Sequence, residues 1–391
     1  MNANPSGATL KNPPSLDISR VETPAYVLEE ALLKRNLAVF DHVQKASGAK
    51  IILALKGFAF WGAFPWIREV LYGATASSLN EARLAHEEMR KEVHVYSVAF
   101  TDKEFPEVLK IADHIVFNSF NQWRRFKPLV KASNRKVTCG LRVNPGYSEV
   151  KTPLYDPCYT NSRLGITREE FKPEELDGIE GLHFHAHCGN NSDTLERVVA
   201  SFEKLYGEYI PKMKWINFGG GHHITKEGYD VEKLIHIVKT FRAKYGVDVY
   251  IEPGEAVGWR TGPLVASVVD KVVNGMEILI LDTSATAHMP DTLEMPYRPE
   301  IRGADEPGVL PHTYRLGGLT CLAGDVIGDY SFSKPMEIGD KIVFEDMIHY
   351  TIVKNSTFNG IPLPSLCIWT EQGELKVMRE FGYAEYKLRN G

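Results

Sequence analysis

Lys56 is the residue whose position most clearly suggests chemistry. It directly follows the apolar run IILAL and is followed by Gly57. An amine at the carboxyl end of a barrel strand points into the mouth, where α/β-barrel enzymes hold their catalytic groups. Once burial or a neighbouring cation lowers its pKa, such a lysine can form a Schiff base with a carbonyl compound. The alternative is a strand-end lysine that reaches out to solvent.

Two later segments could complete a site around this amine. Gly219, Gly220 and Gly221 follow the strand-like run WINF. A glycine run of this kind lets backbone amides approach a phosphate, although a tight turn would explain it as well. Glu252 begins E-P-G-E at the end of the run VDVYI. A carboxylate there could keep a pyridine nitrogen protonated, which makes the ring an electron sink.

Three histidines alternate in the run GLHFHAHCG. On a strand, His183, His185 and His187 would share one face. An imidazole stacked on a cofactor ring would account for one of them. Histidines at i and i+2 can also bind zinc, but no carboxylate-rich segment accompanies these. We therefore predict no metal site and keep zinc as the alternative.

Two residues near the carboxyl end carry weaker signals. Cys321 lies in the glycine-rich run GGLTCLAGD, four residues before Asp325. A loop thiol can donate a proton, although a buried and inert cysteine is the more common case. Tyr350 could offer its phenol to a phosphate, or it could simply pack.

The elements that must position these residues alternate between strands and helices from about residue 25 to 255. Helical spacing of apolar residues is clearest over 77–90 and 230–246. Eight strands with intervening helices predict an α/β fold, a (β/α)8 TIM-like barrel. The strands that we expect are 50–55, 71–75, 93–98, 114–118, 137–143, 181–187, 214–218 and 247–253.

Beyond about residue 260, β-rich runs are separated by Gly or Pro turns. This pattern predicts a C-terminal all-β domain, sandwich-like or barrel-like. The expected organisation is a disordered arm at 1–20, a strand at 21–30 that joins the β domain, the barrel at 31–260 and the β domain at 261–391.

Composition excludes several classes of protein. The net charge of −5 gives no basic field for nucleic acid. The five cysteines are widely spaced with no C-x-x-C, which indicates reduced thiols. There is no secretory h-region and no run long enough to span a membrane. We expect a cytoplasmic protein with no membrane partner.

The order of these landmarks resembles that of the PLP-dependent fold III decarboxylases, the group of ornithine and diaminopimelate decarboxylases. A-L-K, H-F-H, G-G-G, E-P-G, C-x-x-x-D and a Tyr before S-T-F-N-G occur in that order between residues 23 and 360. The runs ALKGFAFWG, HFHAHCGNN and EPGEAVGW are most similar to the branch that acts on carboxynorspermidine and carboxyspermidine. Ornithine-type enzymes carry Arg after E-P-G, whereas this chain has Glu255.

The resemblance implies pyridoxal 5′-phosphate (PLP) as cofactor, a polyamine-type substrate and a homodimer with shared active sites, to which the β domain contributes. Arg142 and Glu81 would support the site. The implied roles are a Schiff base at Lys56, ring stacking by His185, phosphate binding by Gly219, Gly220, Gly221 and Tyr350, a pyridine-nitrogen contact from Glu252, proton return by Cys321 across the dimer, and substrate binding by Glu255, Asp291 and Asp325.

Other functions remain as alternatives at this point. Another fold III decarboxylase of the diaminopimelate or ornithine type would share the same landmarks. A racemase is disfavoured by Glu252, and a non-catalytic decarboxylase-like regulator would tend to lose Lys56 or Cys321, which are both present. Carboxynorspermidine and carboxyspermidine differ by one methylene, which a pocket distinguishes by only about 1–3 kcal/mol. The sequence does not separate them.

Overall fold

The structure, a computed structural model, describes residues 13–391. Two compact units make up the chain. The barrel unit is residues 36–259, and the sheet unit comprises the described residues up to 35 together with residues 260–391. Helix α1 (Glu30–Ser47) begins in the sheet unit and continues as a helix of the barrel unit.

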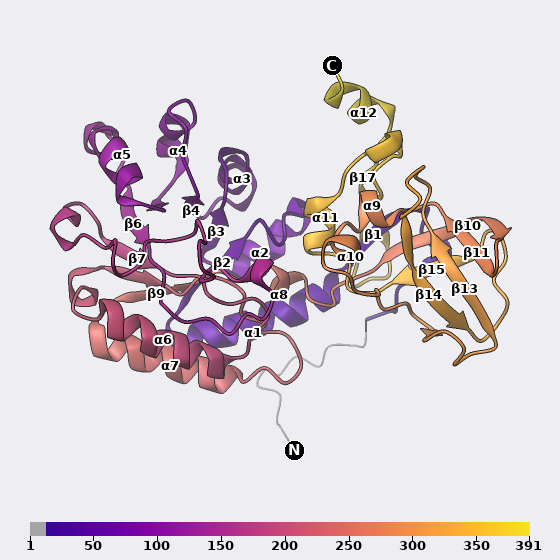
Figure 1. The fold of residues 1–391 in the computed structure, drawn as a ribbon, viewed down its shortest axis with the longest axis horizontal. Coiled ribbons are helices and arrows are strands. Elements are labelled where there is room, and N and C mark those ends of the chain that lie inside the picture. Colours follow the sequence, from indigo (N-terminus) through magenta and orange to yellow (C-terminus); the bar gives the residue numbers. More distant parts are fainter. Residues whose placement is uncertain (1–12) are drawn as a thin grey trace. The chain divides into compact units, whose positions relative to one another are not determined.

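The barrel unit is a closed barrel of eight parallel strands (Figure 1). The last strand pairs with the first, with Tyr250 opposite Lys50. All eight expected strands are confirmed, although the sixth ends at His183 rather than extending to residue 187. The strands are β2 (Lys50–Ala54), β3 (Gly73–Ala76), β4 (Glu92–Ser97), β5 (His114–Phe117), β6 (Thr138–Arg142), β7 (Gly181–His183), β8 (Trp215–Asn217) and β9 (Asp248–Ile251).

Helices lie between these strands, and local signals fix where they begin and end. Ser78 caps α3 by accepting the N–H of Glu81, and Asp230 caps α7 in the same way. Gly246 ends α7 in the left-handed conformation. The helices are α2 (Phe64–Val70), α3 (Leu79–Leu84) with a π-helical turn at Ala85–Met89, α4 (Phe105–Ile111), α5 (Phe120–Ala132), α6 (Ser192–Tyr206), α7 (Val231–Tyr245) and α8 (Glu255–Gly258); short 3₁₀ turns lie at Trp61–Ala63, Pro153–Tyr155, Pro173–Glu175 and Ile210–Lys212.

A large aromatic side chain fills the interior of the barrel. A Cβ at Gly140 or Gly181 would lie 2.3 or 2.2 Å from the Trp215 ring, so both positions require glycine. Trp215 packs in a buried cluster with Ile52, Val116 and Tyr250. The barrel is therefore a packed core, and its chemistry has to lie at one end.

The sheet unit is built around a mixed nine-stranded sheet. Strand β1 pairs parallel to β16 and antiparallel to β10. The strands are β1 (Ala25–Glu29), β10 (Leu264–Val273), β11 (Glu277–Leu281), β12 (Ala304–Asp305), β13 (His312–Gly317), β14 (Val326–Phe332), β15 (Lys341–Phe344), β16 (Ser365–Trp369) and β17 (Leu375–Arg379). Four short helices accompany them, α9 (Ala285–His288), α10 (Asp291–Glu294), α11 (Tyr350–Lys354) and α12 (Tyr383–Arg389), with 3₁₀ turns at Ile18–Arg20 and Phe358–Gly360.

The segment before β1 differs from the expected arm. Residues 1–12 lie outside the described part of the chain. Leu16 is 7% exposed and belongs to the core cluster of the sheet unit. The indole N–H of Trp369 donates to the Pro14 carbonyl at 2.8 Å, and the Lys341 amine donates to the carbonyls of Ile18 and Val21. Residues 13–20 are therefore ordered, because one apolar anchor and several backbone contacts outweigh their polar composition.

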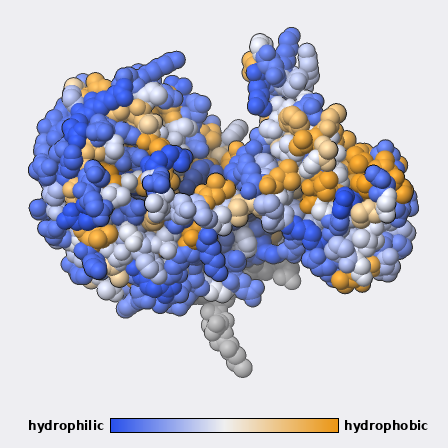
Figure 2. Space-filling view, viewed as in Figure 1, coloured by the Kyte–Doolittle hydropathy of each residue, from blue (hydrophilic) through white to orange (hydrophobic). Residues whose placement is uncertain are grey.

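Hydrophobic and polar side chains are unevenly distributed over the surface. On the face drawn in Figure 2, the barrel unit is mostly hydrophilic, whereas apolar side chains gather on the sheet unit. Val273 of β10 and Val377 of β17 are 77% and 53% exposed. Within residues 13–391, no helix combines the length and apolar character that a membrane crossing requires.

Candidate active site

Lys56 lies two residues beyond the end of β2, in the turn closed by the Gly57 N–H and the Ala54 carbonyl at 3.0 Å. Its side chain lines a cavity of about 420 Å³ at the carboxyl ends of the barrel strands. The volume is in the usual range for a small-molecule site. Polar side chains that line the cavity include Lys56, Tyr96, Arg142, His183, His185 and Glu252.

The surroundings of Lys56 favour its neutral amine. Burial lowers the pKa of Lys56, and the nearby Arg142 guanidinium lowers it further. Glu252 and Glu81 oppose this change without reversing it. The Lys56 side chain is exposed and lines the cavity, so its amine is open to small molecules. A neutral and accessible lysine amine is a nucleophile toward a carbonyl group.

His185 is held as a neutral ring beside this amine. Its Nδ1 accepts the N–H of Gly220 at 2.9 Å, so the neutral ring carries its proton on Nε2. Burial, followed by the charges of Lys56 and Arg142, lowers the pKa of His185 well below its usual value. An uncharged imidazole that is fixed in orientation can stack on a flat ligand without repelling a cationic ring.

Glu252 is a buried carboxylate that a second strand end holds in place. It is 8% exposed, and its Oε1 accepts the amide N–H of Asn217 at 2.8 Å. The carbonyl oxygen of the same amide accepts the N–H of Gly219 at 2.8 Å. His183 Nε2 lies 3.7 Å from Glu252 Oε2. One asparagine thus fixes both the acid and the start of the glycine run.

The glycine run packs tightly on the neighbouring strand ends. Gly219 and Gly221 have φ of +71° and +83°, in the region that favours glycine. A Cβ at Gly219 would lie 2.4 Å from the Phe184 carbonyl, and one at Gly221 would lie 2.2 Å from the His187 carbonyl. The tight turn that the sequence offered as an alternative is therefore part of the structure. Phosphate binding by these glycines remains a prediction.

Glu255 lies farther along the same rim, as the first residue of α8. Its Oε2 lies 3.0 Å from His223 Nε2, and the His223 ring is 5.2 Å from the Trp259 ring. The charges of Glu255 and Lys56 both act on the Cys188 thiol. The predicted substrate-binding acid thus belongs to the rim of the barrel mouth, and it has a histidine partner that the sequence did not reveal.

Cys321 and Tyr350 belong to the sheet unit. Cys321 is exposed, its N–H donates to the Asn359 side chain at 2.7 Å, and both neighbouring leucines are exposed, Leu319 by 43% and Leu322 by 46%. Tyr350 is the first residue of α11. Their predicted roles in catalysis and in phosphate binding are not tested by these contacts.

Asp325 is held by hydrogen bonds within the sheet unit, and its predicted contact with substrate stays a prediction. It is 4% exposed, and its carboxylate accepts the Ser284 hydroxyl, the Thr286 N–H, and both the N–H and the hydroxyl of Thr320. These bonds occupy the carboxylate and shape the loop that carries Cys321. Asp291, the other predicted acid of this unit, pairs with the Lys354 amine.

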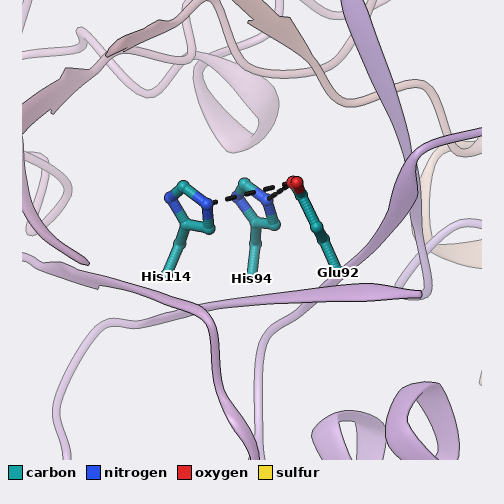
Figure 3. A group of neighbouring side chains, drawn as sticks. All are labelled: Glu92, His94 and His114. Carbon is teal, nitrogen blue, oxygen red and sulfur yellow. Dashed lines mark hydrogen bonds and ion pairs between the residues drawn. The ribbon is translucent and has the colours of Figure 1, made fainter. Parts of the chain in front are cut away.

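Within the described chain, the alternating histidines are not brought together as a group of metal ligands. β7 ends at His183, so the three histidines do not continue along one strand face. His183 and His185 line the cavity, whereas His187 packs against His222 with ring centroids 4.8 Å apart. Within the described chain, the group of three ligand-type side chains close enough to share a metal is Glu92, His94 and His114 (Figure 3).

The geometry of that cluster argues against a shared ion. The His94 and His114 rings are stacked, with centroids 3.9 Å apart and planes 7° apart. A metal bound to histidine lies in the plane of the ring, about 2 Å from its nitrogen, and two stacked parallel rings have no such point in common. Hydrogen bonds explain the cluster instead, since Glu92 accepts the Tyr250 hydroxyl at 3.1 Å and His114 Nδ1 contacts the Thr138 hydroxyl at 2.7 Å.

Several cavity residues were missed from the sequence. Tyr96 faces the cavity, its hydroxyl donates to Asn118 Oδ1 at 2.8 Å, and Arg142 lies over its ring at 4.8 Å. Asn217 stands on a buried strand directly before the glycine run, and that polar position was a usable signal. Phe58, two residues after Lys56, is fully buried in the core and does not line the cavity.

Comparison with known proteins agrees with this arrangement. A family model described as pyridoxal-dependent decarboxylase, C-terminal sheet domain, matches residues 39–348. The chain belongs to the pyridoxal-dependent decarboxylases. The family membership and the fold class expected from the sequence are thereby confirmed, and the decarboxylase class with them.

Two relatives from this family cover almost the whole chain. A carboxynorspermidine/carboxyspermidine decarboxylase from Campylobacter jejuni is 52% identical over 95% of this chain and 99% of its own. A carboxyaminopropylagmatine decarboxylase from Synechocystis is 45% identical over 98% of each chain.

Solved structures of this decarboxylase family give the same picture of the fold. The C. jejuni carboxynorspermidine decarboxylase, crystallised with norspermidine, is 51% identical and has a TM-score of 0.89. The match covers 95% of this chain and 100% of the C. jejuni chain. A diaminopimelate decarboxylase from Helicobacter pylori has a TM-score of 0.82 at 16% identity, which shows a shared fold alone.

Proposed function

We propose that this protein uses PLP to decarboxylate carboxynorspermidine or carboxyspermidine, giving norspermidine or spermidine in polyamine biosynthesis. The observation that carries the proposal is the C. jejuni relative of that name, 52% identical over nearly the full length of both chains. The Lys56 amine, which lines the cavity together with a neutral histidine and a fixed carboxylate, supports it independently.

The residues of the barrel mouth fit PLP. Lys56 would hold the cofactor through its amine, and His185 would stack on the ring. Glu252 would face the ring nitrogen, because Asn217 occupies only one of its oxygens. Gly219 to Gly221 and Tyr350 would bind the phosphate. When bound, PLP supplies the electron sink that accepts the electron pair released as carbon dioxide leaves.

The chain's own groups then carry out the remaining work. Lys56 would offer its amine to the cofactor, and burial followed by Arg142 lowers the pKa of that amine, which favours its neutral form. Glu252 would place its carboxylate against the ring nitrogen, which would favour a proton there. Cys321 of the partner subunit would return a proton to the reacting carbon. Glu255 and Asp291 would bind the cationic tail of the substrate.

A second substrate deserves direct comparison. The relative that is 45% identical is named a carboxyaminopropylagmatine decarboxylase. That substrate ends in a guanidinium group, whereas carboxynorspermidine ends in a primary ammonium. The higher identity to the C. jejuni enzyme favours the ammonium substrate. Diaminopimelate and ornithine are weaker candidates, since the diaminopimelate decarboxylases of Archaeoglobus fulgidus, Bacillus subtilis and Buchnera aphidicola are 23%, 24% and 25% identical.

One set of measurements tests this function. Purified protein incubated with PLP should absorb in the visible, and borohydride should fix the cofactor on Lys56. Carboxynorspermidine, carboxyspermidine, carboxyaminopropylagmatine, diaminopimelate and ornithine are then compared by kcat/KM, with Lys56→Ala as the blank. The proposal fails if the wild-type protein takes up no PLP, or if diaminopimelate or ornithine is the best substrate.

We further propose a homodimer with shared active sites. The exposed Leu319 and Leu322 on either side of the exposed Cys321 support this, because a second copy would cover them. A cytoplasmic location stays a prediction of the sequence.

A further inference from the structure

His183 is a buried histidine at the end of β7 whose ring has unused hydrogen-bonding groups. Its side chain is 2% exposed and lines the same cavity as Lys56. Within residues 13–391, neither of its ring nitrogens has a hydrogen-bond partner. A buried polar group without a partner costs stability, and in native proteins each such group calls for an explanation, a catalytic role among them.

The surroundings of His183 keep its ring uncharged. Burial lowers the pKa of His183 well below its usual value, and the charges of Arg142, Lys56 and His94 lower it further. A neutral imidazole has one N–H group and one acceptor nitrogen. His183 can therefore donate one hydrogen bond to an anion without adding a further positive charge beside Lys56.

Glu252 is the anion nearest to that N–H group. Asn217 donates to Oε1 of Glu252 at 2.8 Å, whereas Oε2 lies 3.7 Å from Nε2 of His183. A charge-assisted bond needs a separation of about 2.8 Å, and hydrogen bonds of catalytic groups often tighten to such lengths only when the ligand binds. A small rotation of either side chain closes the gap.

We propose that His183 is a positioning residue that donates its Nε2–H to Oε2 of Glu252 when PLP is bound. The inference deepens the proposed function, on which it rests for the cofactor. An ionised carboxylate oxygen has two lone pairs, so Oε2 can accept from His183 and from the ring nitrogen together. Donors on both oxygens stabilise the ionised carboxylate. The proton shared by Glu252 and the ring nitrogen therefore stays on the nitrogen.

Two substitutions separate this role from packing. The edge of the His183 ring contacts Tyr96, with ring centroids 5.6 Å apart. His183→Phe keeps a flat ring against Tyr96 but removes the N–H donor. His183→Gln loses the ring but places an amide N–H near the position of Nε2. If the donor decides the effect, the glutamine variant resembles the wild type. If packing decides it, the phenylalanine variant does.

His187 provides a matched control in the segment that follows β7. It is 1% exposed, and within the described chain both of its ring nitrogens also lack a hydrogen-bond partner. Its ring packs on His222 and does not line the cavity. His187→Phe therefore makes the same change at a buried histidine and leaves the donor to Glu252 in place.

The test measures where the proton lies. Each variant is loaded with PLP that carries ¹⁵N at the ring nitrogen, and the ¹⁵N chemical shift distinguishes a protonated ring from a neutral one. In His183→Phe this shift should move toward the value of a neutral ring. The kcat should fall about 10-fold at unchanged KM, because one hydrogen bond to a charged group is lost. His183→Gln and His187→Phe should keep the wild-type shift.

A wild-type ¹⁵N shift in PLP-loaded His183→Phe overturns the inference, as does an equal change in His183→Gln or in His187→Phe. A second measurement needs no substitution of His183. In protein with ¹⁵N-labelled histidine, one Nε2–H resonance should move downfield when PLP binds to the wild type, and it should not do so in Glu252→Gln. The same movement in both proteins contradicts the proposed bond.

The two proposals fail in different ways. If the protein takes up no PLP, both are overturned. If His183→Phe changes the ring nitrogen as expected but diaminopimelate or ornithine is the best substrate, the proposed substrate is overturned and the role of His183 is supported. If carboxynorspermidine is decarboxylated and the ring nitrogen does not respond to His183→Phe, the role of His183 alone is overturned.

Discussion

The charge of the Lys56 amine depends on groups that pull in opposite directions. Burial and Arg142 lower its pKa, whereas Glu252 and Glu81 raise it. Arg142 is itself fixed, because its guanidinium lies 4.8 Å from the centre of the Tyr96 ring. A charge fixed near the amine costs no reorganisation when the amine reacts. The residues around Lys56 thus prepare a nucleophile before any ligand arrives.

Glu252→Gln should lower kcat while PLP still binds. Glutamine keeps the shape and can still contact Asn217, but it carries no charge to hold a proton on the ring nitrogen. Loss of one such electrostatic contact costs about 100- to 1000-fold in kcat. Steady-state kinetics measure the loss, and the visible spectrum confirms that the cofactor is retained. An unchanged kcat in the PLP-loaded variant contradicts the assigned role.

Asp325→Asn should cost stability rather than substrate affinity. The carboxylate accepts hydrogen bonds from Ser284, Thr286 and Thr320. In asparagine, an NH2 group replaces one carboxylate oxygen, so a donor would then face some of these donor groups. An unsatisfied buried group of this kind costs about 1–3 kcal/mol. Denaturant unfolding measures the loss, with Asp291→Asn as the comparison. A raised KM at undiminished stability would instead support the predicted contact of Asp325 with substrate.

At the scale of elements, the loop after β8 brings the site residues together. Asn217 ties the loop to Glu252, and the Gly220 N–H orients His185. The loop can do this only because its glycines pass close to the ends of the neighbouring strands. Three strand ends are thus joined into one rim by a few backbone and side-chain bonds.

Gly221→Ala should weaken PLP binding and lower stability more than Gly228→Ala. The two glycines have nearly equal φ of +83° and +80°, but a Cβ at Gly221 would lie 2.2 Å from the His187 carbonyl, and one at Gly228 meets nothing within 4 Å. Both variants bear the strain of positive φ, about 1–2 kcal/mol. Denaturant unfolding and PLP titration of both variants measure the cost of the close contact at Gly221. Equal losses of stability and of PLP affinity in the two variants would show that this contact has no effect.

The sequence predicts the elements well because their signals are local. Eight apolar runs and the helical spacing between them specify the barrel, and Ser78 and Asp230 mark two helix starts. Which partners a side chain meets is not a local property. The hydrogen bonds of Asp325 come from residues as far as 41 positions away, and Glu255 meets His223 from 32 positions away. These contacts required the fold.

At the scale of the whole molecule, Glu92 and His114, the first residues of β4 and β5, make the free energy of unfolding sensitive to acid. Burial, followed by His94, lowers the pKa of His114 from 6.5 to about 2. Below pH 6.5 the unfolded chain therefore binds a proton that the folded chain excludes. The free energy of unfolding decreases as the pH is lowered. For Glu92, burial would raise the pKa, but its hydrogen bond to His94 and the charge of Lys50 lower it to about 2, which adds a second loss below pH 4.5.

His114→Gln should therefore make the unfolding free energy less dependent on pH between 6.5 and 4.5. The number of protons taken up on unfolding should fall by about one in that range. Denaturant unfolding of the PLP-loaded protein at several pH values measures the slope. His42→Gln, an exposed histidine on α1 whose side chain is 46% exposed, is the control and should leave the slope unchanged.

Two chains of a dimer that shares its active sites should complement each other's inactivating substitutions. If Cys321 of the partner subunit completes the site that contains Lys56, then Lys56→Ala and Cys321→Ala are each inactive alone. In a mixed dimer, one site carries both substitutions and the other carries neither. Random mixing of equal amounts gives half mixed dimers, so about a quarter of wild-type activity should return after dissociation and reassociation.

Activity is measured against the unmixed variants, and sedimentation confirms the dimer. No recovery in a mixture that does contain mixed dimers would place each site within a single chain, and the exposed thiol beside Leu319 and Leu322 would then need another explanation.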